Sequence, residues 1–505
     1  MMRRINLLLL IIVFSAVLLA SCATGQQPTK QESGNLNWFN RLEDEEPDST
    51  SGQQDDDSLF RIEAMRQSGT NLYFFDESAS QLSTEVLRLS GEYSDKDQLE
   101  HIVTKLIDGP STTELISTLP EGINVNRVDL TEGIITVDLS PEFYQAEDLA
   151  LARAALVNTL LELGNAKYVK ILIEGNEATV TPEHTSGVLG LLTRYPVNIA
   201  DIQALEAQSF ANPEAAKINR ELYFQDNAGQ FLLPEVRTIT VKDGNYSEAI
   251  IRELIKGPAK EGMGYYPTLA KSTNLVKTEV VEKDDETSGI GLYFSNEFNS
   301  QFTGGRQREI VMVSSIIYSM STLPDIDFIN IYYDNGNGEF INKSDGNISY
   351  EDLTAERFPD KIGKRIRVYY GDDQGMLLIP EYRAISRKET NLLSSILIEM
   401  TKEPILPDSI RVIPPELSIE DIRVKTLGNM AVVDAPIRYF DGIDKDNRRL
   451  LQGLYAVVNT LTDPMNSCGV SEVQFTIEGD LIDSYDDISL KEPFVMNPAL
   501  IKGGP

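Results

Sequence analysis

The hydrophobic and polar positions of this chain repeat three times at the scale of a domain. Each repeat begins with a short aromatic strand, at residues 72–75, 222–225 and 368–371, and Tyr73, Tyr223 and Tyr369 mark the same point in each. Repetition at a spacing of about 150 residues predicts three similar modules in series, since each copy is long enough to bury its own core.

The pattern inside one repeat predicts its elements. In the first repeat, Leu99, Ile102, Val103, Leu106 and Ile107 form one apolar stripe of a helix that Gly109-Pro110 ends. Two strands follow at 123–130 and 134–139, then a second helix at 146–163 and a strand at 169–174.

The second and third repeats keep this order, so each unit is predicted to be β-β-α-β-β-α-β. The predicted fold class is α+β, with two helices packed on a small, mostly antiparallel sheet in each module. The predicted organisation is a signal peptide (1–21), an acidic tether (22–65), module 1 (66–190), a connector (191–217), module 2 (218–357) and module 3 (361–497).

The amino terminus predicts export. Arg3 and Arg4 precede an apolar run from Leu7 to Ala20, and Cys22 follows small residues, an arrangement typical of a secretory signal peptide. The sequence Leu-Ala-Ser-Cys at 19–22 resembles the bacterial lipobox, which implies cleavage before Cys22 and attachment of lipid, including palmitate, to its sulfur. The alternatives are a plain signal peptide or a membrane-spanning helix, although a span needs about 20 apolar residues.

Charge narrows the range of partners. The chain has 45 basic and 78 acidic residues, a net charge of −33, and such a surface repels nucleic acid and anionic lipids. With Cys22 carrying lipid, Cys468 remains alone, so we expect no disulfide within the mature chain.

The sequence predicts no catalytic, metal or cofactor site. The two histidines, His101 and His184, occupy unrelated positions in their repeats, and no arrangement suggests a catalytic triad or a zinc site. The segments 334–339 and 441–446 resemble fragments of calcium loops but lack the full ligand spacing, so ordinary turns are the favoured interpretation.

One polar pair recurs inside the second helix. Asn158-Thr159 and Asn459-Thr460 lie in near-identical apolar surroundings, and both residue types are poor helix formers. We favour a structural role, with side-chain hydrogen bonds to a neighbouring strand or turn; contact with a ligand is the alternative.

The repeated motifs resemble a known family. They include Leu-Val-Asn-Thr-Leu at 156–160, Val-Val-Asn-Thr-Leu at 457–461, Ile-Glu-Gly at 173–175 and 477–479, and Leu-Pro-Glu-Val-Arg and Ile-Pro-Glu-Tyr-Arg at 233–237 and 379–383. This ordered set, following a lipobox, resembles the GerMN domain of GerM-type sporulation and germination lipoproteins. Module 2 departs from the helix motif, reading Ile-Tyr-Ser-Met at 317–320.

The resemblance implies a non-catalytic lipoprotein at the outer face of the cytoplasmic membrane that docks envelope or sporulation-complex proteins. It also implies self-assembly, because the fold is similar to modules that pack edge to edge into rings. Two other classes stay open from the sequence: an enzyme that acts on peptidoglycan through a carboxylate pair, and a solute-binding lipoprotein of a transporter.

Overall fold

The structure is a computed structural model of the chain. It describes residues 69–88, 95–164, 166–183, 187–283, 287–299, 305–342, 348–414, 421–442 and 447–503. The predicted signal peptide, Cys22, the tether and His184 lie outside the described residues. None of the helices in these ranges is long and apolar enough to cross a membrane.

Module 1 and the connector follow the predicted order of elements. They contain β1 (Gly69–Asp76), β2 (Gln81–Arg88), α3 (Asp95–Asp108), β3 (Val125–Thr131), β4 (Ile134–Leu139), α4 (Leu149–Leu160), β5 (Tyr168–Ile173), β6 (Asn176–Glu177), β7 (Leu191–Leu192) and α5 (Ile199–Ser209). The region predicted as a connector thus includes β7, which pairs with β5, and α5, which packs on α4.

Modules 2 and 3 repeat this order. Module 2 contains β8 (Lys217–Gln225), β9 (Leu232–Thr240), α6 (Tyr246–Lys256), β10 (Leu275–Glu282), β11 (Ser288–Phe294), α7 (Gly305–Met320), β12 (Phe328–Asp334) and β13 (Phe340–Ile341). Module 3 contains β14 (Gly363–Asp372), β15 (Leu378–Ser386), α8 (Leu392–Thr401), β16 (Ser409–Ile410), β17 (Arg423–Leu427), β18 (Met430–Ala435), α9 (Ile437–Gly442), α10 (Asn447–Leu461), β19 (Glu472–Ile477), β20 (Ser484–Tyr485), β21 (Ile488–Ser489) and β22 (Phe494–Val495).

The predicted α+β class is confirmed, and the strands of each module form two sheets where the sequence suggested one. The first two strands pair as a separate antiparallel hairpin: β1 with β2, β8 with β9, and β14 with β15. The second sheet has a parallel pair at its centre, β4 with β5, β11 with β12 and β18 with β19. The second helix of each module makes this parallel pairing possible, because it carries the chain back across the sheet.

Each module has its own apolar core, in which buried side chains of both helices pack between the hairpin and the second sheet. The core of module 2 also takes in Val188, just before β7, and Ala384 of module 3. Apolar packing therefore continues from one module to the next.

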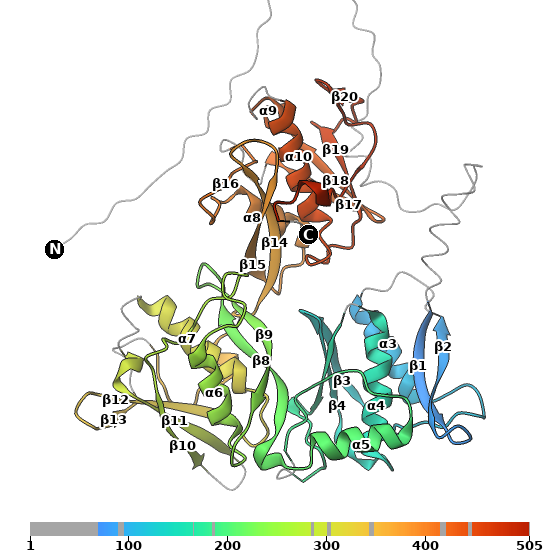
Figure 1. The fold of residues 1–505 in the computed structure, drawn as a ribbon, viewed down its shortest axis with the longest axis vertical. Helices are drawn as coiled ribbons and strands as arrows, with labels where there is room; N and C mark the ends of the chain where they lie inside the picture. The colour runs from blue at the N-terminus through green and yellow to red at the C-terminus, as the bar shows by residue number, and fades with distance from the viewer. Residues whose placement is uncertain are drawn as a thin grey trace, which may run out of the picture.

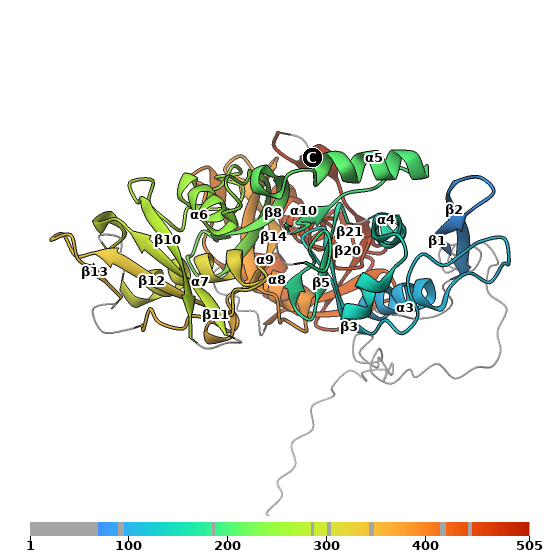
Figure 2. The same ribbon diagram turned by 90° about the horizontal axis from the view of Figure 1, so that it is seen from below.

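The modules are not arranged as a string. Modules 1 and 2 lie side by side, and module 3 sits above them (Figure 1). Seen from below, β1–β2 of module 1 and β10–β13 of module 2 occupy opposite ends of the lower row (Figure 2). This arrangement puts the contacts between modules at the centre of the molecule and two strand systems at its ends.

Candidate functional site: the junctions between the modules

The recurring polar pair holds each module together from inside. The N–H of Tyr73 in β1 donates to Thr159 Oγ1 at 3.0 Å. The Asn158 amide binds the backbone of Tyr195 twice, since its Nδ2 donates to the carbonyl at 3.1 Å and its Oδ1 accepts the N–H at 2.8 Å. Both α4 side chains are buried, so the pair joins the hairpin and the post-β7 segment to the helix.

Module 3 makes the same contacts. The N–H of Tyr369 donates to Thr460 Oγ1 at 3.1 Å. The Asn459 amide donates to the Asn497 carbonyl at 3.0 Å and accepts its N–H at 2.9 Å. Asn158 and Asn459 thus each secure the segment that follows the last long strand of their module.

Module 2 reaches the same result with other side chains. Ser319 Oγ accepts the N–H of Tyr223 at 3.0 Å, as the two threonines do for the equivalent tyrosines. Tyr318 replaces asparagine, and its hydroxyl donates to the Phe358 carbonyl at 2.8 Å. The apparent departure of this helix from the motif is therefore a change of side chain with the connection kept.

A glutamate that the sequence analysis did not single out secures the loop after the first helix. Glu235 accepts the N–H of Ala259 with both oxygens at 3.0 and 3.1 Å, and Glu381 accepts the N–H of Ile405 at 3.0 and 2.9 Å. Glu85 accepts the equivalent N–H, that of Ser111, at 2.9 Å. Each donor residue directly follows the proline that ends the helix.

The arginine of the same motif completes this arrangement in two modules. Arg237 donates to the carbonyl of Gly257 at 2.9 Å, and Arg383 donates to that of Glu403, each just before the proline. The Pro-Glu-x-Arg and Gly-Pro motifs are thus two halves of one contact. Equal spacing of Glu85, Glu235 and Glu381 in the repeats was the signal that could have revealed it.

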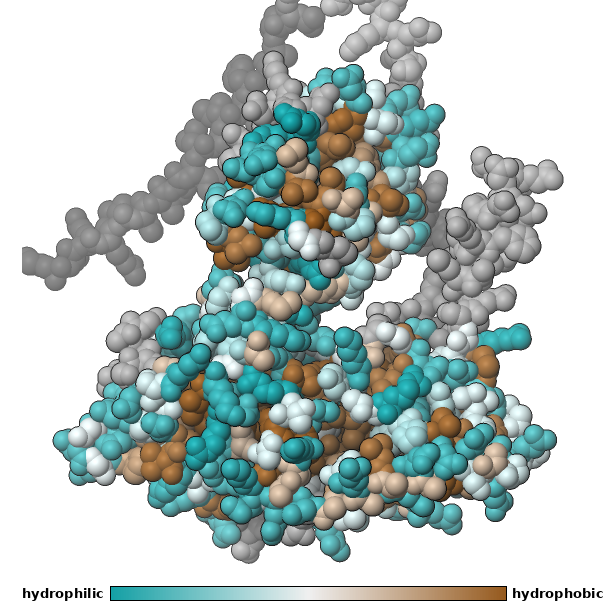
Figure 3. All heavy atoms as spheres, in the orientation of Figure 1, coloured by the Kyte–Doolittle hydropathy of each residue, from teal (hydrophilic) through white to brown (hydrophobic). Residues whose placement is uncertain are grey.

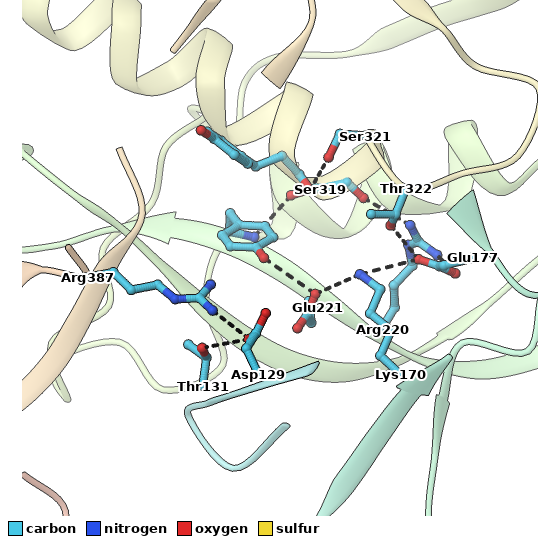
Figure 4. Close-up of polar contacts among 12 residues, drawn as sticks. Asp129, Thr131, Lys170, Glu177, Arg220, Glu221, Ser319, Ser321, Thr322 and Arg387 are labelled. Atoms are coloured by element: carbon cyan, nitrogen blue, oxygen red, sulfur yellow. Dashed lines mark hydrogen bonds and ion pairs between the residues drawn. The ribbon is translucent and has the colours of Figure 1, made fainter. Parts of the chain in front are cut away.

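A buried cluster of charges joins module 1 to module 2 (Figure 4). Glu177 of β6 receives Arg220 of β8 at 2.6 Å and the Thr322 hydroxyl at 2.7 Å. Lys170 of β5 lies 3.7 Å from Glu177 and 2.9 Å from Glu221 of β8. The side chains of Arg220 and Glu177 are only 3% and 2% exposed, so this ion pair is shielded from solvent.

The ionised form of Glu177 is the one that the network favours. Burial alone would raise its pKa, but the charges of Arg220 and Lys170 and the Thr322 hydrogen bond outweigh burial and lower it. The backbone adds a further contact, because the N–H of Glu177 donates to the Thr322 carbonyl at 2.7 Å. Thr322 occupies the position of Glu162 and Asp463 in the other modules, and its neutral side chain leaves room for the carboxylate of module 1.

The β3–β4 hairpin of module 1 contacts module 3 through two acids. Asp129 forms an ion pair with Arg387 at 2.6 Å. Glu132, at the tip, accepts the N–H of Arg365 at 2.8 Å and lies 3.8 Å from its Nε. Burial raises the pKa of Glu132, and the charges of Arg365, Lys364 and Lys260 oppose that rise.

Arg365 also reaches module 2, so this one side chain contacts all three modules. Its Nη1 donates to the Met263 carbonyl at 3.0 Å, and its guanidinium lies 4.8 Å from the centre of the Tyr265 ring. Nearby, Gly264 approaches Tyr382 so closely that a Cβ on Gly264 would lie 2.9 Å from the tyrosine Cβ. The junction therefore fixes the positions of the modules relative to one another.

Two cavities open at these junctions. One of about 510 Å³ is lined by Val188 of module 1 and by Asn245, Thr278 and Asp325 of module 2, among others. A second of about 520 Å³ lies between modules 1 and 3, where Asp129, Lys364 and Met465 contribute to its lining. Both are hollows between modules with mixed polar and apolar walls.

Of the two calcium-loop fragments, 334–339 lies within the described residues, whereas residues 443–446 of the other lie outside them. Asp334 caps its own turn by accepting the N–H groups of Gly336 and Gly338, as an ordinary Asx turn does. In the described ranges, no group of three or more acids, histidines and cysteines could hold a metal ion. Cys468 is half-buried, and burial raises the pKa of its thiol to about 11.

Comparison with known protein families gives the repeat a name. The model of the Germane family, described as sporulation and spore germination, matches residues 71–179, 221–339 and 367–483. The chain belongs to the Germane family. The three matched regions coincide with the three modules, so this member carries three Germane domains and is a protein of sporulation or germination.

Solved structures give related matches. The chain is similar to the tandem GerMN domains of the sporulation protein GerM from Bacillus subtilis, with 19% identity, a TM-score of 0.21, and coverage of 57% of this chain and 98% of that one. It is also similar to the first GerMN domain of GerM, with 23% identity, a TM-score of 0.20, and coverage of 23% and 89%. No curated protein sequence matches the chain.

Proposed function

We propose that this Germane protein is a non-catalytic, lipid-anchored scaffold that docks protein partners outside the cytoplasmic membrane during spore formation or germination. The observation that carries the proposal is the junction network: the buried Arg220–Glu177 ion pair, the partly buried contacts of Arg365 and shared apolar packing hold three modules in one arrangement. A fixed arrangement of surfaces binds partners at a lower entropic cost than a flexible string of domains, because fewer degrees of freedom are lost on binding.

The outward surfaces support the same proposal. In the orientation of Figure 3, apolar residues reach the surface of module 3, and of the lower modules, among hydrophilic ones. The exposed large apolar side chains of that module are Met376, Ile398, Leu406, Leu427, Ile437, Leu451, Leu481 and Val495. Exposed apolar side chains of this kind offer area that a protein partner could cover.

Membrane attachment is the part of the proposal that rests on the predicted signal peptide and Cys22. Lipid on Cys22 would hold the chain at the membrane, since each buried methylene of an acyl chain contributes about 0.8 kcal/mol. In cell fractionation we expect the wild-type protein in the membrane pellet and Cys22→Ala in the soluble fraction or retained as an uncleaved precursor. Cys468→Ala is the matched control and should remain in the pellet; a membrane-bound, processed Cys22→Ala protein would overturn the anchoring proposal.

The docking role is tested in the source organism by deletion and complementation. We expect deletion to lower the yield of heat-resistant spores or the rate of germination, and the wild-type gene to restore it. Glu177→Ala, which weakens the module 1–module 2 junction, should restore less than the exposed control Asp108→Ala. Equal complementation by Glu177→Ala and Asp108→Ala would overturn the rigid-scaffold proposal.

A further inference from the structure

The cavity between modules 1 and 2 combines acids with an apolar wall. Its volume is about 510 Å³, and Val188 and Leu323 are among its apolar lining residues. Glu214, Asp243 and Asp325 also line it and are exposed, whereas no lysine or arginine is among the described residues that do. A cavity of this size suits a small organic molecule, and the acidic lining favours a cation.

An equivalent cavity lies between modules 1 and 3. Asn245 and Asn391 cap α6 and α8, since each side chain accepts an N–H of the first helical turn. Asp243 and Glu389, two residues before these caps, are therefore equivalent. Asp243 lines the first cavity and Glu389 the second, so the two cavities lie against the same turn of their modules.

The two cavities differ in their bases. Lys364 and Arg387 line the cavity of module 3, and Arg387 forms an ion pair with Asp129 at 2.6 Å. By the register of the β8–β9 and β14–β15 hairpins, module 2 has the apolar Ile218 and Val241 at these positions. Its cavity thus keeps the acid and lacks the bases.

Three polar side chains of this cavity are available to a ligand. Across the described ranges, the carboxylates of Glu214 and Asp243 have no ion-pair partner. Ser247 is 6% exposed and lines the cavity, and its hydroxyl has no hydrogen-bond partner in the same ranges. A buried hydroxyl without a partner is costly, so a ligand that donates a hydrogen bond to it would be favoured.

The placement of the acids favours a ligand with several separated charges over a metal ion. Glu214, Asp243 and Asp325 do not form a group that could hold a metal ion, as is true throughout the described residues. Ammonium groups joined by methylene chains match the cavity better, because each ammonium can approach one carboxylate while the methylenes cover the apolar wall. The net charge of −33 also attracts such cations.

We propose that this cavity binds a linear polyamine, with ammonium groups at Glu214 and Asp243 and one hydrogen bond to the Ser247 hydroxyl. Val188 belongs to module 1 and Asp243 to module 2, so the ligand bridges the junction that Glu177 secures. A ligand that binds only the closed junction stabilises it by mass action. The inference goes beyond the docking role and does not depend on it.

Titration calorimetry with spermidine tests the proposal on the mature chain with Cys22→Ser. We expect saturable binding of one spermidine in a buffer that contains Mg²⁺, which screens non-specific attraction to the acidic surface. With spermidine at about ten times its Kd, hydrogen exchange at the N–H of Glu177 should slow roughly tenfold. Absence of saturable binding, or unchanged exchange at residue 177, would overturn the proposal.

Three variants locate the site. Glu214→Gln/Asp243→Asn removes both charges and should bind spermidine about fivefold or more weakly; asparagine suits the left-handed backbone of residue 243, whose φ is 52°. Ser247→Ala should bind about threefold more weakly and keep the urea midpoint of the wild type, because its hydroxyl has no partner to lose. Glu389→Gln, at the equivalent position in module 3, is the matched control and should bind like the wild type.

Two outcomes of these titrations would contradict the assignment. Equal affinity of the double variant and of Glu389→Gln would mean that spermidine only screens a negatively charged chain. Tighter binding of the peptide acetyl-Lys-Leu-Lys-amide than of spermidine would assign the cavity to basic side chains of a protein and overturn the polyamine site. The spore assays of the scaffold proposal are independent of both results.

Discussion

Removing the carboxylate of Glu177 is the most informative perturbation of the junction between modules 1 and 2. In Glu177→Ala, Arg220 keeps a contact with the Ser319 carbonyl at 3.3 Å but loses its only carboxylate within ion-pair distance among the described residues, while its side chain stays 3% exposed. Lys170 keeps Glu221 at 2.9 Å. The uncompensated charge is therefore that of Arg220, and breaking a buried pair in this way costs about 3–5 kcal/mol.

Hydrogen exchange at residue 177 measures that cost directly. Its N–H donates to the Thr322 carbonyl across the junction, so it exchanges when the junction opens. A loss of about 3–5 kcal/mol corresponds to exchange that is roughly 100- to 5,000-fold faster. We expect Asp108→Ala, which removes an exposed ion pair with Lys105, to change this rate by less than about fivefold.

A double variant separates charge from shape. Glu177→Ala with Arg220→Met removes both charges and fills the space with an apolar side chain, and we expect it to recover much of the lost protection against hydrogen exchange.

The junction should also weaken in acid. Because the folded-state pKa of Glu177 lies below its ordinary value of 4.5, its contribution is fully present above pH 4.5 and is lost as the pH falls through the lowered pKa. Exchange in Glu177→Ala no faster than in Asp108→Ala would refute the reasoning.

Three further predictions follow from single contacts. Thr460→Val leaves the buried N–H of Tyr369 without its acceptor and should lower the free energy of unfolding in urea by about 1–3 kcal/mol. Thr460→Ser should lower it less, because Ser319 accepts the equivalent N–H in module 2. Equal losses in the two variants would contradict this. Asn459→Ala removes both hydrogen bonds to Asn497, so limited proteolysis should cut the carboxyl-terminal segment faster than in wild type. Because the pKa of Glu132 is raised, its contribution to the free energy of unfolding is fully present below pH 4.5 and is lost as the pH rises through the raised pKa. The stability of Glu132→Gln, measured by urea unfolding, should therefore decline less steeply with rising pH than that of the wild type. An unchanged pH profile would contradict this.

The sequence was sufficient for the parts of the fold that local pattern controls. The apolar stripe at Leu99–Ile107 predicted α3, and the repeated strands and helices led to three modules of the α+β class, because hydrophobic periodicity reports which face of an element is buried. The split of each module into two sheets escaped prediction, since periodicity does not reveal which strands pair.

The junctions were beyond sequence reasoning for a related physical reason. Glu177, Arg220 and Arg365 look like ordinary charges among many, and only the packing of distant segments makes them buried partners. The glutamates at 85, 235 and 381 repeat at equal spacing, but their partner N–H groups lie about 25 residues away and carry no side-chain signature. At Tyr318 the sequence differs but the contact is kept, because the tyrosine hydroxyl reaches the Phe358 carbonyl in place of the asparagine contact.

The docking role itself is tested most directly by crosslinking in intact cells, followed by affinity purification of the lipidated protein and mass spectrometry, in growing and in starved cultures. The account predicts that proteins of spore formation or germination are recovered with the wild-type chain from starved cells, and in lower yield with Glu177→Ala. Recovery of wall-synthesis enzymes or a transporter from growing cells, with no spore protein from starved ones, would contradict it.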